Sequence, residues 1–199
     1  MVSNPKLYEI NTRVWLNKFR NNGNKATLDD IPDSILDDIA EKGFDYLWLM
    51  GIWQTCPSTI NKYCFRDYLV NSYRKALKDF SEKDVIGSPY AIDTYIVNNS
   101  IGGNSALERL RKRLHERNIK LILDFVPNHF SVESLTLKTN PEIFLQGDEE
   151  LFKRDSYTFF KSVYDSKVYA HGRDPFFPAW EDTVQVNYFS PEARSYMHL

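Results

Sequence analysis

The side chains best suited to chemistry lie at the end of a short apolar run in the second half of the chain, and directly after it. Residues 121–125 form that run and contain Asp124, and Asn128 and His129 come shortly after it. A carboxylate accepts hydrogen bonds, and a neutral imidazole donates one and accepts one. Each residue also has a plainer interpretation, because an aspartate often caps a loop and a single histidine is usually structural.

Aromatic side chains are the second chemical signal. They make up 15% of the chain, with 13 Phe, 12 Tyr and 4 Trp. Packing in the core is the ordinary role of such residues. Tyr and Trp rings can also stack on the apolar faces of pyranoses, so the composition is compatible with sugar recognition.

Charge and cysteine content exclude several classes of protein. The 25 Lys and Arg residues against 27 Asp and Glu give a net charge of −2, which offers no electrostatic case for a nucleic-acid or membrane partner. No apolar run approaches the length of a membrane span, and the first residues lack the apolar core of a signal peptide, so we expect a cytoplasmic protein. Cys56 and Cys64 are expected to be reduced thiols, since zinc needs about four ligands.

The apolar pattern predicts alternating strands and helices. Strands are expected at 7–10, 46–50 and 121–125, and the last two lack polar alternation, as in parallel sheets buried on both faces. Apolar residues recur at helical spacing after Pro32, and Gly43 would end this helix. A further helix is expected in the long segment after the second strand, with Leu69, Tyr73 and Phe80 on one face. Ser105 and Glu108 form a capping-box pattern for a helix that Asn118 would end. Ser190, Pro191 and Glu192 open a last helix.

This order predicts an α/β fold with right-handed parallel crossovers. Residues 1–126 would form the first three βα units of a barrel with a long insertion after the second strand. Residues 127–189 are too long for an ordinary loop and would form an inserted subdomain, and residues 190–199 would begin the third barrel helix. Because a closed (β/α)8 barrel needs about 250 residues, we expect the opening part of a larger barrel, with a small three-strand domain as the alternative.

Several segments, in order, resemble the α-amylase family, glycoside hydrolase family 13. The strongest similarity is that of Asp124-Phe125-Val126-Pro127-Asn128-His129 to the family signature D-x-V-x-N-H at the end of the third barrel strand. The other matching segments are Leu7-Tyr8-Glu9-Ile10-Asn11, Gly43-Phe44-Asp45-Tyr46-Leu47-Trp48-Leu49-Met50, Ser88-Pro89-Tyr90-Ala91-Ile92-Asp93-Thr94-Tyr95 with Ile101-Gly102-Gly103, and Asp182-Thr183-Val184-Gln185-Val186-Asn187-Tyr188 with Pro191-Glu192-Ala193-Arg194. The resemblance implies a partial TIM barrel whose inserted subdomain corresponds to the family's domain B.

The resemblance also implies roles for three residues. Asp124 would be a carboxylate that supports the site, His129 would donate a hydrogen bond to a sugar hydroxyl, and Tyr90 would stack on the same sugar ring. An isolated tyrosine is otherwise more often a core residue. The family's nucleophile, acid/base and third aspartate come from strands four, five and seven, so we expect no catalytic residue in this chain.

Two departures from the family pattern affect the site. Asn128 matches a calcium-ligating position, but Gln185 stands where many members have an aspartate, so we expect no calcium and no other cofactor. Asp93 lies one place before the usual aspartate position, which Thr94 fills, and this leaves the anchoring of the Tyr90 loop open. Arg173 and Asp174 are expected either to contact domain B or to form a solvated charge pair.

The functional expectation is therefore an N-terminal fragment of a retaining glycoside hydrolase or transglycosylase. It would act on α-linked oligo- or polysaccharide together with the missing remainder of the barrel. The alternatives are a non-catalytic truncated module that binds sugar or assists a partner chain, and an unrelated small α/β domain.

Overall fold

The computed structural model describes residues 4–20 and 25–198, and the chain divides into two units. The first unit comprises Met1–Gln54 and Tyr95–Phe125, and the second comprises Thr55–Thr94 and Val126–Leu199. The excursion after the second strand therefore groups with the residues that follow Phe125, whereas the sequence analysis had placed it with the barrel units. Each unit is described separately below.

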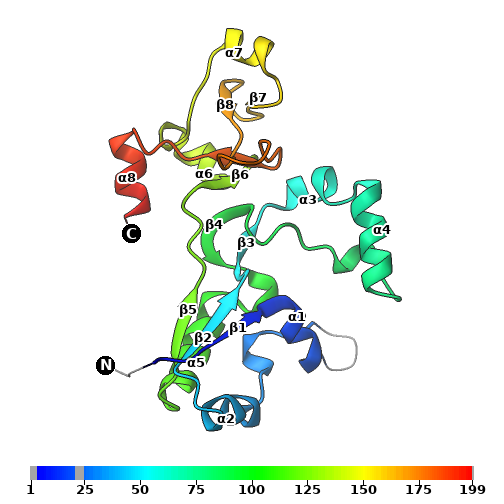
Figure 1. Ribbon diagram of the computed structural model, residues 1–199, viewed down its shortest axis with the longest axis vertical. Coiled ribbons are helices and arrows are strands. Elements are labelled where there is room, and N and C mark those ends of the chain that lie inside the picture. Colours follow the sequence, from blue (N-terminus) through cyan, green and yellow to red (C-terminus); the bar gives the residue numbers. More distant parts are fainter. Residues whose placement is uncertain (1–3, 21–24, 199) are drawn as a thin grey trace. The chain divides into compact units, whose positions relative to one another are not determined.

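A three-stranded parallel sheet forms the centre of the first unit. Strands β1 (Leu7–Asn11), β2 (Tyr46–Met50) and β5 (Lys120–Leu123) lie side by side in the order β1-β2-β5 (Figure 1). In the register, Tyr46 lies opposite Leu7 on one side and Lys120 on the other. The parallel pairing predicted from the unbroken apolar runs is confirmed.

Two helices of this unit lie in the segments where the helical spacing predicts them, whereas the short helix directly after β1 was not predicted. After β1 come α1 (Thr12–Leu16) and the short 3-10 turns η1 (Asn17–Phe19) and η2 (Leu28–Asp30). Helix α2 (Asp33–Glu41) precedes β2, and η4 (Asn99–Ile101) and α5 (Gly103–His115) precede β5. The predicted ends at Gly43 and Asn118 are confirmed, because both residues have positive φ, at 74° and 58°.

The predicted start of α5 at a Ser105–Glu108 capping box is wrong. The N-cap lies three residues earlier, at Gly102, which has a φ of 105°. A Cβ atom at Gly102 would lie 2.5 Å from the Cβ of Ala106, so this entry to the helix needs a residue without a side chain.

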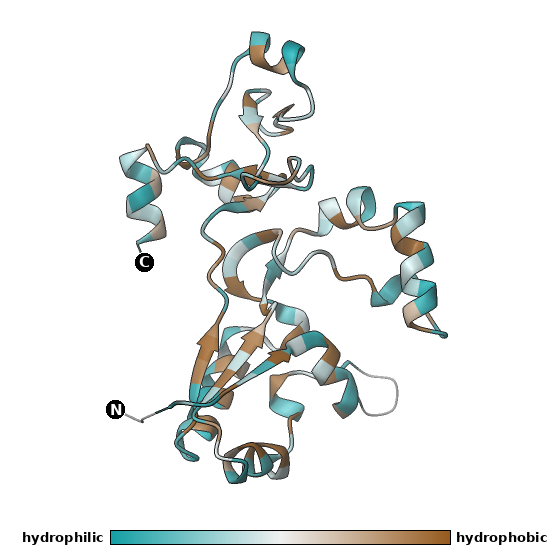
Figure 2. Ribbon diagram, in the orientation of Figure 1, coloured by the Kyte–Doolittle hydropathy of each residue, from teal (hydrophilic) through white to brown (hydrophobic). Residues whose placement is uncertain are grey.

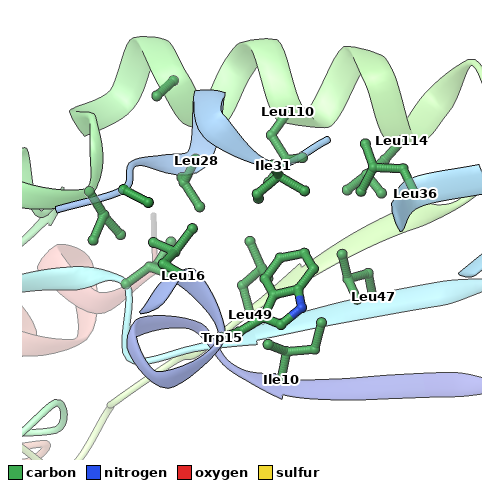
Figure 3. Close-up of a cluster of buried hydrophobic side chains, with 14 of the residues drawn as sticks. Ile10, Trp15, Leu16, Leu28, Ile31, Leu36, Leu47, Leu49, Leu110 and Leu114 are labelled. Atoms are coloured by element: carbon green, nitrogen blue, oxygen red, sulfur yellow. The ribbon is translucent and has the colours of Figure 1, made fainter. Parts of the chain in front are cut away.

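The core of the first unit lies between the sheet and its helices. Leu47 and Leu49 of β2 face Leu36 of α2 and Leu110 and Leu114 of α5, and all five are fully buried (Figure 3). Strand β5 is largely apolar, whereas β1 contains polar residues as well (Figure 2). At the surface, three arginines of α5 and of the turn after it pair with aspartates of η2 and α2, as Arg109–Asp29, Arg113–Asp33 and Arg117–Asp37.

The second unit has shorter elements. Its first segment contains α3 (Pro57–Tyr63), α4 (Asp67–Ala76) and η3 (Glu82–Asp84). Two antiparallel pairs follow, β6 (His129–Ser131) with β9 (Thr183–Gln185), and β7 (Phe159–Lys161) with β8 (Val168–Ala170). The remaining elements are α6 (Leu135–Thr139), η5 (Pro141–Ile143), α7 (Glu149–Arg154) and α8 (Pro191–Met197). Within residues 127–189, all of which the structure describes, no helix is longer than six residues.

Two connections complete the fold. Strands β3 (Trp53–Thr55) and β4 (Ile92–Val97) pair with each other, and the boundary between the units falls within both strands. The predicted cap of the last helix is confirmed, because Ser190 Oγ accepts a hydrogen bond from the Ala193 amide at 3.2 Å.

Cys56 and Cys64 are free thiols. Within the described residues, no helix has the length and apolar character that crossing a membrane requires.

Candidate functional site

Asp124 follows directly on β5 and is held by groups at the end of β2. Its Oδ1 atom accepts a hydrogen bond from Trp48 Nε1 at 2.8 Å, and its Oδ2 atom accepts one from the Gly51 amide. The Asp124 carbonyl accepts a third from Trp53 Nε1 at 2.9 Å. The side chain is 7% exposed. The carboxylate is therefore fixed in position, with both oxygen atoms engaged.

Aromatic rings gather beside Asp124 in the same unit. The Tyr95 ring stacks on Phe125 at 6.1 Å and meets Trp53 edge to face at 5.3 Å. Phe125 is 62% exposed, so part of this ring cluster faces solvent. No sequence pattern predicted Trp53, Tyr95 or Phe125 as site residues. The high aromatic content was the one signal for them, and it does not say which rings gather.

His129 is the first residue of β6 in the second unit. Its Nδ1 atom lies 3.2 Å from the Asn128 side-chain nitrogen, and its ring also hydrogen-bonds to the Tyr90 backbone. The Trp180 ring meets the imidazole edge to face at 5.1 Å. Burial lowers the pKa of His129, and the bond to Tyr90 opposes that shift in part. The imidazole is therefore neutral at physiological pH and is held by three neighbours.

Tyr90 and His129 thus come together in the second unit, although 38 intervening residues separate them in the sequence. The Tyr90 side chain is 38% exposed, and the residues after it, Ala91 and Ile92, are buried. This placement leaves the ring accessible while the backbone is fixed. Asp124 lies in the first unit.

The segment that carries Tyr90 is anchored by Asp93. The Asp93 carboxylate accepts a hydrogen bond from the Leu135 amide at 2.5 Å, and Thr136 Oγ1 donates to the Asp93 carbonyl at 2.8 Å. Both partners lie at the start of α6. Burial raises the pKa of Asp93. Asp93 therefore anchors the segment that carries Tyr90, although it lies one place before the family's usual aspartate position.

The groups around Asn128 do not suit a calcium ion. Gln185 Nε2 donates to the Asn128 side-chain oxygen at 3.0 Å and to its carbonyl at 2.9 Å. The oxygen atoms that a cation would need therefore accept amide hydrogens instead. Within the described residues, no group of three or more His, Cys, Asp or Glu side chains could hold a metal ion. The absence of calcium stays a prediction.

Arg173 forms hydrogen bonds through its backbone, and Asp174 forms them through its side-chain carboxylate. The Arg173 carbonyl accepts a hydrogen bond from the side-chain nitrogen Nδ2 of Asn128 at 3.3 Å. The Arg173 backbone amide donates one to Gln185 Oε1 at 3.2 Å. The Asp174 carboxylate accepts from the Phe176 and Phe177 amides at 2.7 and 3.0 Å. Both residues therefore shape the loop next to Asn128.

The backbone at Gly172 lies in close contact with His129. Gly172 lies so near that an added Cβ atom would be 2.8 Å from the His129 Cβ and 2.5 Å from Thr183 Oγ1. Its amide and carbonyl bond to Thr183 and Trp180. The absence of a side chain at Gly172 is what lets the loop lie against the histidine.

Comparison with known proteins assigns the family. Residues 16–198 match the family model described as alpha amylase, catalytic domain. The chain belongs to the alpha-amylase family. The chain accordingly has a partial TIM-barrel-like α/β fold. No curated protein matches the chain.

Solved structures of alpha-amylase relatives share the fold at low sequence identity. An alpha-amylase from Lactobacillus plantarum is 21% identical with a TM-score of 0.59, and the match covers 97% of this chain and 34% of that one. The trehalose-6-phosphate hydrolase of Bacillus licheniformis is 19% identical with a TM-score of 0.63, covering 98% and 32%. The alpha-glucosyl transfer enzyme XgtA is 16% identical with a TM-score of 0.64, covering 97% and 32%. The chain spans about a third of the length of these relatives.

Proposed function

We propose that this chain is the sugar-holding part of an α-amylase-family glycoside hydrolase or transglycosylase that acts on α-glucosidic carbohydrate with retention. The observation that carries the proposal is the hydrogen bond between the His129 ring and the Tyr90 backbone. It joins the two residues to which the family resemblance assigns contact with one sugar ring. Membership of the family and the names of its relatives, which include a hydrolase and a glucosyl transfer enzyme, support the reaction class.

Each residue has a distinct role in this proposal. Tyr90 presents a half-exposed ring on which the apolar face of a pyranose stacks. The neutral His129 imidazole has one N–H, and the Tyr90 backbone occupies it, so a sugar hydroxyl would replace that contact to accept the hydrogen bond. Asp124, in the first unit, holds the loop after β2 in place through Gly51 and Trp48, which is the supporting role that the family resemblance implies.

Bond cleavage needs two further groups. Retaining glycosidases use a carboxylate nucleophile and a carboxylic acid about 5–5.5 Å apart. The resemblance assigns them to barrel strands beyond the third, and the parallel sheet described here has three strands. We therefore propose that neither carboxyl group belongs to this chain and that the chain alone positions sugar without cleaving it.

The test combines turnover with binding. We expect the purified chain to release no detectable product from an α-glucoside and to bind methyl α-glucoside weakly, and we expect Tyr90→Ala and His129→Ala to abolish that binding. Turnover that Asp124→Asn abolishes would show that the chain has its own catalytic machinery. Binding without turnover, in a chain that no further polypeptide activates, would favour the non-catalytic module.

A further inference from the structure

Arg13 lies shortly after β1 and holds the turn that follows β2. Its Nε atom donates a hydrogen bond to the Gly51 carbonyl at 3.1 Å, and its Nη2 atom donates one to the Trp53 carbonyl at 3.4 Å. Gly51 comes directly after β2, and Trp53 is the first residue of β3. One guanidinium group therefore spans residues 51–53, which we call the β2 turn. No sequence pattern predicted a role for Arg13.

Asp124 holds the same turn from another strand. Its Oδ2 atom accepts a hydrogen bond from the Gly51 amide, and its carbonyl accepts one from Trp53 Nε1 at 2.9 Å. Strand β2 lies between β1 and β5, so Arg13 reaches the turn from one neighbouring strand and Asp124 reaches it from the other (Figure 1). Gly51 and Trp53 therefore bind Arg13 through their carbonyl groups and Asp124 through N–H groups.

The positive charge of Arg13 has no counter-ion in the part of the chain that the structure describes. None of the ion pairs formed there includes Arg13. Burial lowers the pKa of Arg13 to about 10, so the guanidinium stays protonated at neutral pH. Removing a cation from water costs free energy unless hydrogen bonds replace the lost solvation. The two carbonyl groups of the β2 turn supply such bonds, and a charged donor makes them stronger than neutral ones.

The shape of the guanidinium matters here as well as its charge. Nε and Nη2 lie on a rigid planar group, which fixes the spacing of the two carbonyl groups that they bind. A lysine carries the same charge as a single point at the end of a flexible chain, so it does not hold two acceptors at a fixed spacing. Arg13 therefore fixes the shape of the β2 turn in a way that a lysine would not.

The β2 turn helps to determine where the Asp124 carboxylate and a neighbouring ring lie. Trp48 of β2 binds the other carboxylate oxygen, Oδ1, at 2.8 Å. The Trp53 ring, besides donating to Asp124, meets Tyr95 edge to face at 5.3 Å. A displaced turn would move the Gly51 amide away from the carboxylate and shift the Trp53 ring at the same time. The geometry around Asp124 therefore depends on how firmly this turn is held.

We propose that Arg13 is a positioning residue for the Asp124 carboxylate and that it acts through the β2 turn. In this role Arg13 needs no contact with sugar. By holding the carbonyl groups of Gly51 and Trp53, it directs N–H groups of the same two residues at Asp124. The inference rests on the proposed function, in which Asp124 has a supporting role at the sugar site.

Hydrogen exchange measured by NMR tests the geometry. We expect Arg13→Lys to speed exchange of two reporter protons, the Gly51 amide and the Trp53 indole N–H, at least about tenfold, because the turn opens more often. Arg13→Gln, which can keep one of the two hydrogen bonds, should give a smaller increase. The Leu47 amide of β2 reports on overall unfolding and should exchange at its wild-type rate. Unchanged exchange of the reporter protons would overturn the inference.

Arg113→Lys is the matched control. Arg113 belongs to α5 in the same unit, and its guanidinium also donates to a backbone carbonyl, that of Ile31. This variant should leave the exchange of both reporter protons unchanged. An equal increase in the two lysine variants, or faster exchange at Leu47 in the Arg13 variant, would indicate a general loss of stability. Either result would contradict a positioning role for Arg13.

The affinity for methyl α-glucoside shows whether Arg13 acts on the site through Asp124. In an NMR titration, we expect Arg13→Lys and Asp124→Asn each to weaken binding about fivefold. The double variant should bind no more weakly than Asp124→Asn alone, because both changes disturb the same turn. Independent effects would multiply to about 25-fold, and that result would contradict the assignment of Arg13 to Asp124.

The pattern of results separates the two proposals. If the wild-type chain binds no methyl α-glucoside, the proposed function fails, and the exchange rates alone decide whether Arg13 positions Asp124. If Tyr90→Ala and His129→Ala abolish binding while Arg13→Lys leaves the affinity unchanged, the proposed function stands and the inference about Arg13 fails.

Discussion

The two units of this chain are stabilised in different ways. The first unit has a regular parallel sheet covered by helices, with a continuous core of leucines and isoleucines. The second unit has strands of three residues each, and many of its segments are joined by side chains that bond to the backbone, such as Asp93 with Leu135 and Gln185 with Asn128. The residues proposed to touch sugar lie mostly in the second kind of structure. The positions of these residues therefore depend on individual polar contacts more than on regular elements.

The largest effect is expected from the core of the first unit. Leu47 is fully buried, so Leu47→Ala should lower the free energy of unfolding by about 3 kcal/mol through lost burial and the cavity left behind. Urea denaturation measures this value. Leu135→Ala is the control in the second unit, because Leu135 is 48% exposed and should lose less than about 1 kcal/mol. Equal losses would remove the contrast between the units.

A smaller effect is expected where Gly172 approaches His129. Gly172→Ala would place a methyl group too close to Thr183 Oγ1 and the His129 Cβ, at a cost of about 1–2 kcal/mol. The imidazole resonances of His129 in an NMR spectrum should shift, and sugar binding should weaken. Unchanged resonances would show that the loop moves away without disturbing the histidine.

Acid should destabilise the second unit through two histidines, the partly buried His129 and the buried His171. Burial lowers the pKa of both His129 and His171 in the folded chain. The unfolded chain therefore binds protons more readily, and stability falls as the pH decreases below about 6.5, the ordinary pKa of histidine. Urea denaturation between about pH 8 and pH 5 measures the slope. His171→Gln should flatten it, and a wild-type slope in that variant would contradict this account.

The smallest effect is expected at the surface of the first unit. Asp33 pairs with Arg113 and Arg117 at 3.1 Å, but its side chain is 64% exposed. Asp33→Asn should therefore cost less than about 1 kcal/mol, and the difference should shrink further in high salt. Urea denaturation at low and high salt checks both expectations. A salt-independent loss of several kcal/mol would mean that the row of arginine–aspartate pairs holds α2 and α5 together.

The sequence predicted the first unit much better than the second. Unbroken apolar runs located β2 and β5, and Gly43 and Asn118 marked helix ends, because these signals are local. The capping box at Ser105 failed because Gly102 allows an earlier turn that side-chain patterns do not reveal. The grouping of residues 55–94 with the chain after Phe125 was not predicted, since it depends on contacts between distant segments.

The candidate site shows the same division. The motif from Asp124 to His129 pointed to residues that the structure holds in defined positions, and the resemblance added Tyr90. The partners that hold them are Trp48, Gly51, Trp180 and Gly172, and no local pattern singles them out. Asp93 was noticed as a departure from the family pattern, and its anchoring role became visible in its bonds to α6.

Helix α4 has a consequence for how this protein can change over evolutionary time. Because none of its residues is buried, substitutions along it leave the hydrophobic core intact. Leu69 and Tyr73 of this helix line a cavity of about 680 Å³, and new side chains there would change the shape of that cavity at little cost in folding free energy. The cavity can therefore be reshaped by substitutions in α4 while the core of the chain stays the same.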